Sequence, residues 1–184
     1  MSLVRLVSDT SILSDTDIKN LIEESRLQIT ELEYSTIGTA SIDLRLSPIL
    51  IKYPPQTITI GIDHPQGYEI DITGSSYKLR PGEFILGMTR EQVRIPDGYL
   101  GVIETRGNIA RAGIQVHSND GHIDPGFCGN ITLEIVNLHK DDVCIELVPD
   151  TFICQLFIGK LSSANTTTYK GKYLHQKKPT TYLP

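Results

Sequence analysis

The 184-residue sequence has no tryptophan, only two methionines and only three cysteines. It lacks any run near the roughly 20 apolar residues of a membrane span, and its first residues lack the hydrophobic stretch of a signal peptide. Cys128, Cys144 and Cys154 are too widely separated for a zinc-ligand pattern, and an odd number does not suit a disulfide framework. We therefore expect buried free thiols in a cytoplasmic protein.

Positive charge is also scarce, with 17 Lys and Arg against 22 Asp and Glu and a net charge of −5. Sequence-independent affinity for nucleic acid comes from a basic surface, so this balance argues against a nucleic-acid-binding protein. The length is that of one domain, and neither a repeat nor a linker divides it. We treat residues 1–184 as a single domain.

The patterning predicts a mainly β protein. Ser14 and Asp17 form a capping box before a helix over residues 15–26. Segments with the alternation or composition of strands follow at residues 41–46, 57–62, 68–72, 143–148 and 152–158. Turns punctuated by Pro and Gly separate them, which indicates a sandwich or a barrel.

Glu134 interrupts the apolar, β-branched segment ITLEIVN. Burial disfavours an ionised carboxylate unless donors or a cation compensate, and proteins use such sites for general acid and base chemistry. The alternative is an ordinary glutamate on the solvent side of the strand, which is the commoner arrangement for one residue taken alone.

The preceding segment, RGNIAR at residues 106–111, is predicted to begin a short helix that ends at Gly113. The first N–H groups of a helix are unpaired and can bind an anion, and Arg106 and Arg111 flank them. Arginine suits phosphate oxygens, although either could be a surface charge. Turn signals at 118–121 and 124–126 then fold the chain back, so that phosphate contacts and Glu134 can meet at one ligand.

The order RGNIAR, GHIDPGF, GNITLEIVN and KYLHQ resembles the dCTP deaminase family of the dUTPase-like superfamily. Upstream segments, including SIDLRL, LRPGEFILG and IPDGYLGVIETR, extend the resemblance over essentially the whole chain. It implies a distorted jelly-roll β-barrel with an N-terminal helix, and zinc-independent hydrolytic deamination of dCTP to dUTP and ammonia.

The resemblance also assigns roles to residues. Glu134 matches the catalytic glutamate, which acts as general base on the water that attacks C4 of cytosine, and Arg111 matches an arginine close to the reacting centre. The triphosphate-binding part matches Arg106, Gly107, Asn108, Ile109 and Ala110. The sugar and base positions match Asp124, Phe127, Thr132 and Leu133. The arm that closes over the nucleotide, at about residues 165–184, supplies Tyr169, Lys172 and Gln176.

Some positions depart from the family pattern. Gly107 and Asn108 stand where the family usually has serines, the first of which lies near the attacking water. Asn119 and Asp120 stand where small or hydroxyl residues are more usual. Asp120 is either a turn former before Gly121 or a second carboxylate that acts on the water. The spacer between Tyr169 and Lys172 is shorter than usual.

Two other functions remain open. In dUTPases an aspartate in the place of Asp124 activates water for attack on the α-phosphate, and some relatives perform both reactions, giving dUMP and pyrophosphate. The loss of the serines also allows a nucleotide-binding regulator without turnover. The sequence lacks the H-x-E and P-C-x-x-C pattern of zinc deaminases.

The resemblance further implies a homotrimer with each site at a subunit interface, so that RGNIAR and Glu134 serving one nucleotide come from different chains. Magnesium is expected on the triphosphate rather than in a protein cage. dTTP is a candidate feedback inhibitor.

Overall fold

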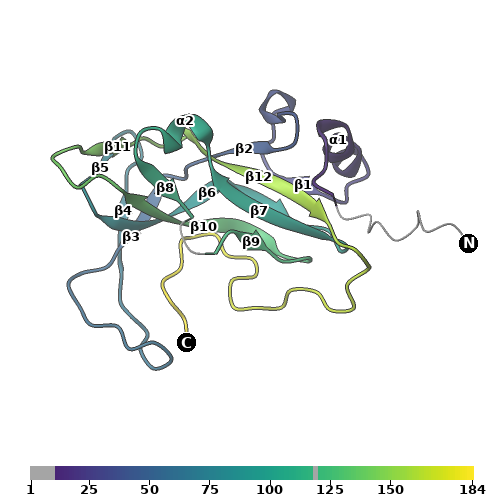
Figure 1. The fold of residues 1–184 in the computed structure, drawn as a ribbon. Coiled ribbons are helices and arrows are strands. Elements are labelled where there is room, and N and C mark those ends of the chain that lie inside the picture. The colour runs from purple at the N-terminus through teal and green to yellow at the C-terminus, as the bar shows by residue number, and fades with distance from the viewer. Residues whose placement is uncertain (1–10, 118–119) are drawn as a thin grey trace, which may run out of the picture.

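The computed structural model describes residues 11–117 and 120–184. The described chain is mainly β, as predicted, and Figure 1 shows its strands stacked in layers with the N-terminal helix at one end. The first elements are α1 (Asp15–Glu23), β1 (Gln28–Ile29), the 3-10 turn η2 (Tyr34–Thr36), β2 (Ile42–Arg45), β3 (Ile49–Lys52) and β4 (Tyr68–Asp71). They are followed by β5 (Tyr77–Leu79), β6 (Phe84–Arg94), β7 (Tyr99–Thr105), α2 (Gly107–Ala110), β8 (Ile114–Val116), β9 (His122–Ile123), β10 (Cys128–Asn137), β11 (Ile145–Leu147) and β12 (Phe152–Lys160).

Two sheets make up most of the fold. One runs β4-β3-β6-β10-β8, with β1 added beside β6, and the other runs β2-β12-β7-β9. All their pairings are antiparallel, and β11 with β5 forms a separate ribbon. In the described residues the sheets are not joined into one closed barrel, so the architecture is a jelly-roll-like sandwich.

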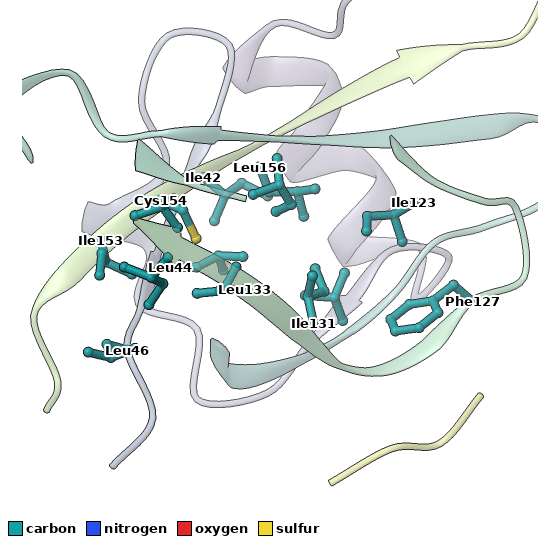
Figure 2. Packing of buried hydrophobic residues seen from close by; sticks show 14 of the residues in the cluster. Ile42, Leu44, Leu46, Ile123, Phe127, Ile131, Leu133, Ile153, Cys154 and Leu156 are labelled. Atoms are coloured by element: carbon teal, nitrogen blue, oxygen red, sulfur yellow. The ribbon is translucent and has the colours of Figure 1, made fainter. Parts of the chain in front are cut away.

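The core lies between the two sheets and consists mainly of Ile, Leu and Val side chains. Figure 2 shows Leu44, Cys154 and Leu156 packed with Leu133 in the middle of this cluster, and Ile123 at one end. Because β10 contributes every second side chain to the core, its other face is free to carry polar residues. The core therefore fixes the direction in which Glu134 points.

The helix prediction is correct in place but too long. Ser14 caps α1 by accepting a hydrogen bond from the backbone N–H of Asp17 at 3.4 Å, as the capping box predicts. The helix ends at Glu23 rather than 26, because Ser25 takes a left-handed backbone conformation with φ of 56°.

The predicted strand at residues 57–62 is wrong. This segment is an irregular loop between β3 and β4, and Ile60 and Ile62 are 75% and 71% exposed. Pro54 and Pro55 precede it, and Gly61 has φ of 86°, which breaks the extended backbone. Alternation alone does not make a strand where no partner strand is available. In Figure 1 the loop extends from β3 and β4 toward the C-terminus.

The expectation of three buried thiols is only partly correct. All three cysteines are free, but Cys154 is buried, Cys128 is partly buried and Cys144 is exposed. Burial in the apolar core raises the pKa of the Cys154 thiol.

Candidate active site

Glu134 lies near the middle of β10, on the floor of a cavity. It pairs across the sheet with Leu86 of β6. Successive side chains of a strand point to opposite faces, so Leu133 is fully buried in the core while Thr132 and Glu134 line the cavity. The prediction of a half-buried strand at Glu134 is confirmed.

The cavity has a volume of about 560 Å³, within the range of small-molecule sites. Its walls come from β6, β10, the β3–β4 loop, the chain between β8 and β10, and the C-terminal arm at residues 165–184. Besides Glu134, the described lining residues are Tyr53, Ile58, Ile60, Phe84, Leu86, His117, Asp120, His122, Ile123, Asp124, Phe127, Ile131, Thr132, Tyr169, Tyr173, Gln176, Thr180 and Tyr182.

Three polar residues around β9 form a row on the cavity wall. Asp120, His122 and Asp124 alternate with Gly121 and Ile123, and Ile123 turns to the core. The Nδ1 atom of His122 lies 2.5 Å from Asp120 Oδ1, and its Nε2 atom lies 4.0 Å from Asp124 Oδ1. Asp120 therefore contacts another titratable group, His122. Ser118 and Asn119, the first half of that predicted turn, lie outside the described residues.

His117 also lines the cavity, and the sequence reasoning missed it. Its backbone N–H donates to the carbonyl of Glu134 at 2.9 Å, and neither buried ring nitrogen has a hydrogen-bond partner among the described residues. Burial lowers the pKa of the imidazole, while the charges of Glu134 and Asp120 act in the opposite direction. No motif marked this histidine. Its position between an apolar strand and a turn was the only available signal.

The C-terminal arm folds over the cavity of its own chain. The backbone N–H of Tyr169 donates to Pro125 at 2.8 Å, and that of His175 donates to Cys128 at 2.6 Å. The rings of Tyr169 and Phe127 are in tilted contact, with centroids 5.8 Å apart. The arm thus places Tyr169 beside Phe127, despite the short spacer that follows it.

Gln176 is held at the end of the cavity nearest the start of β10. Its Nε2 donates to the carbonyl of Asn130 at 2.7 Å, and its Oε1 accepts from Thr132 at 3.3 Å and from Thr180 at 3.2 Å. These contacts group Gln176 with Thr132, as a shared role at the base requires. Lys172 is exposed, lies 3.5 Å from the carbonyl of Leu183, and is not among the residues that line the cavity.

The predicted phosphate segment lies elsewhere on the chain. The helix α2 is exposed apart from Ile109, and none of residues 106–111 is among those lining the cavity with Glu134. The Nε atom of Arg106 donates to Asp43 at 3.0 Å, and its Nη1 donates to Asn108 at 2.8 Å. A single chain therefore does not bring the arginines and Glu134 together at one cavity, contrary to the inference from the turn signals.

Gly107 begins α2 in open space. A Cβ added there would meet nothing within 4 Å. The departure from the family's serine is therefore not forced by crowding within the chain.

Within residues 11–117 and 120–184, no three His, Cys, Asp or Glu side chains are grouped so that they could hold a metal ion. The same part of the chain includes no helix long and apolar enough to cross a membrane.

Comparison with known proteins gives one family. A family model described as dCTP deaminase-like matches residues 12–161. The chain is 41% identical over 182 residues to a protein of Dictyoglomus thermophilum named "dCTP deaminase, dUMP-forming", covering 92% of both chains. It is 33% identical over 170 residues to the protein of the same name from Persephonella marina, covering 90% of this chain and 93% of the relative.

Solved structures agree in fold. The 2′-deoxycytidine 5′-triphosphate deaminase of Agrobacterium tumefaciens matches 82% of this chain with a TM-score of 0.64 at 19% identity. This chain spans about half of that protein, since the match covers 48% of it. A native dUTPase of EIAV matches 79% of this chain with a TM-score of 0.50 at 17% identity.

Proposed function

Because this chain belongs to the dCTP deaminase-like family, we propose that it deaminates dCTP and then removes pyrophosphate to yield dUMP. The membership predicted from RGNIAR, GHIDPGF and GNITLEIVN is confirmed. The observation that carries the proposal is that Glu134 and Asp124 line one cavity. These are the carboxylates that the family resemblance assigns to the two reactions.

The product differs from the first expectation, which was dUTP. Relatives up to 41% identical and matched over most of their length are named as dUMP-forming. Those names favour the bifunctional alternative, with dUMP, ammonia and pyrophosphate as products.

In the first reaction, Glu134 accepts a proton from a water molecule as the water oxygen bonds to C4 of cytosine. The carboxyl then returns that proton to the exocyclic nitrogen, the remaining hydroxyl proton on C4 passes to N3, the C4–N bond breaks, and ammonia leaves. Glu134 can take this role because its side chain faces the cavity from the middle of β10.

In the second reaction, a water molecule bonds to the α-phosphorus, Asp124 accepts its proton, and the bond to the β-phosphate oxygen breaks to release pyrophosphate. Asp124 can also accept a hydrogen bond from the 3′-hydroxyl of the sugar, as the resemblance to the deaminases implies. Its place near Phe127 and His122 is compatible with either role.

The triphosphate requires positive charge, and the described residues that line the cavity include no lysine or arginine. We propose that Arg106, Arg111 and the N–H groups of α2 come from a second protomer of a homotrimer, since α2 is exposed and separate from the cavity. Lys172 would reach the phosphates once the arm adjusts. Magnesium bound to the nucleotide would offset phosphate charge. The cytoplasmic location stays a prediction.

The test is to incubate the purified protein with dCTP and magnesium, separate the nucleotides by chromatography, and record ammonia and pyrophosphate together. The proposal predicts equal amounts of ammonia, pyrophosphate and dUMP. A parallel reaction starts from dUTP, to measure the second step alone.

Each of the other outcomes would indicate a different function. Ammonia with dUTP as the final product would indicate a deaminase without the second step. Hydrolysis of dUTP without ammonia from dCTP would indicate a dUTPase. Nucleotide binding without either product would favour a regulator.

A further inference from the structure

The cavity has an apolar end that neither catalytic carboxylate explains. We define the apolar chamber as the part of the cavity lined by Tyr53, Ile58, Ile60, Phe84, Leu86 and Tyr182. We propose that this chamber accepts a substituent on C5 of the pyrimidine, so that the protein also deaminates 5-methyl-dCTP and forms a thymine deoxynucleotide. This inference rests on the proposed function.

The chamber is one connected surface. The rings of Tyr53 and Phe84 are stacked, with centroids 6.4 Å apart and planes 15° from parallel. The backbone N–H of Tyr182 donates to the Tyr53 hydroxyl at 3.1 Å, and the Tyr182 hydroxyl accepts from Gly61 at 2.7 Å. These contacts join the C-terminal arm to the β3–β4 loop and hold Ile60 at the cavity.

Strand register places the chamber beside Glu134. Thr132 lies opposite Met88, Glu134 opposite Leu86, and Val136 opposite Phe84. Positions two residues apart on a strand point to the same face and are separated by about 7 Å. Along this face, the lining therefore changes from the hydroxyl and amide of Thr132 and Gln176, through Glu134, to apolar side chains.

The groups around the cytosine ring follow the same order as the cavity lining, from polar to reacting to apolar. The reacting C4 lies between a polar edge, with N3 and O2, and an apolar edge, with C5 and C6. The amide and hydroxyl side chains can hydrogen bond to N3 and O2. With C4 at Glu134 and the polar edge toward Gln176, the C5 edge faces Leu86 and Phe84, and a methyl on C5 enters the chamber as an apolar group.

The chemistry needs no new group. The water oxygen bonds to C4, one water proton passes through Glu134 to the departing nitrogen, the other passes to N3, and ammonia leaves. The methyl on C5 is unchanged, so the base becomes thymine. Removal of pyrophosphate by the second step then gives dTMP.

The experiment compares kcat/KM for dCTP, 5-methyl-dCTP and 5-hydroxymethyl-dCTP with the full chain. We expect kcat/KM for 5-methyl-dCTP to equal or exceed that for dCTP, by up to roughly 10- to 200-fold, since that is the effect of one methyl group that fits a hydrophobic pocket. The hydroxymethyl compound should be roughly 100-fold poorer than the methyl compound, because its hydroxyl would be buried among apolar groups.

A matched pair of variants tests the chamber itself. Ile60→Trp adds bulk at a residue that lines the chamber but is 75% exposed, so that the fold can tolerate it. It should lower the ratio of kcat/KM for 5-methyl-dCTP over dCTP at least about tenfold. The control is Ile62→Trp in the same loop, which is 71% exposed and is not a lining residue, and it should leave the ratio unchanged.

The outcomes separate the two proposals. If the wild-type protein does not deaminate dCTP, both the proposed function and this inference are overturned. Normal deamination of dCTP with 5-methyl-dCTP more than roughly 100-fold slower would overturn this inference alone. An unchanged ratio in Ile60→Trp would show that the methyl group does not occupy the chamber.

Discussion

At the scale of single residues, alternation along β10 decides which side chains face the ligand. It points Thr132 and Glu134 into the cavity and buries Leu133 in the core. The sequence named all three as binding residues, but Leu133 is fully buried and does not line the cavity. Alternation could have predicted this difference, because both neighbours of Leu133 were assigned to the site.

Substitutions at the two carboxylates should affect the two reactions separately. We expect Glu134→Gln to lower ammonia release from dCTP by more than about 100-fold while dUTP is still hydrolysed, because the amide keeps the shape but cannot accept a proton. Asp124→Asn should release ammonia and accumulate dUTP. Ammonia and pyrophosphate are measured for both variants. Near-normal ammonia release by Glu134→Gln would contradict its assignment as the base.

His117 should make stability depend on pH. Burial lowers its pKa in the folded state, so below the ordinary value the unfolded chain binds a proton that the folded chain does not. The free energy of unfolding should therefore fall as the pH drops below about 6.5, and His117→Gln should remove part of that fall. Urea unfolding at several pH values measures it. His64→Gln, at an exposed position, is the control, and an equal effect in both variants would contradict the assignment.

At the scale of elements, regular strands were predictable from the sequence and the covering segments were not. β2, β4, β11 and β12 lie where alternation or β-branched composition placed them. Residues 57–62 have the same alternation, but no neighbouring strand pairs with them. Their position is set instead by contacts with the arm more than a hundred residues away, through Gly61 and Tyr182. Such a long-range contact leaves no periodic signal in the sequence.

The contact between the loop and the arm can be tested at one amide. Tyr182→Phe removes the hydroxyl that accepts from the Gly61 N–H. A hydrogen bond contributes about 1 kcal/mol, so we expect Gly61 to exchange its amide hydrogen roughly fivefold faster. NMR-detected hydrogen exchange gives the rate. The control is Tyr68→Phe, at a tyrosine that is 48% exposed, which should leave the exchange rate of Gly61 unchanged. An unchanged exchange rate of Gly61 in Tyr182→Phe would mean that other contacts hold the loop.

At the scale of the whole molecule, one chain holds the proposed phosphate segment and the cavity of Glu134 apart. Glu134 lines the cavity, whereas Arg111 lies at the end of α2 on an exposed surface. Sequence order placed both within about thirty residues, which suggested a common ligand but gave no information about which protomer contributes each. The family resemblance implied that they come from different chains, and within one chain the fold separates them, because β8, β9 and β10 lie between α2 and Glu134.

Mixing two inactive variants tests the shared site. Glu134→Gln and Arg111→Ala protomers, unfolded together and refolded at equal concentration, should regain activity in about a quarter of the sites, because half the protomers supply each intact residue. Ammonia release is measured beside each variant refolded alone. If light scattering shows trimers but the mixture has no activity, both residues must act from the same protomer.

The three cysteines differ in exposure and therefore provide chemical reporters of the arm and of the core. Cys144 is exposed on the ribbon side, Cys154 is sealed in the core with a raised pKa, and Cys128 lies under the arm, where its carbonyl accepts from His175. A maleimide dye should therefore label Cys144 first and Cys154 only on unfolding. The rate at which the dye labels Cys128 in a Cys144→Ser protein would follow how often the arm lifts, without any change to the nucleotide.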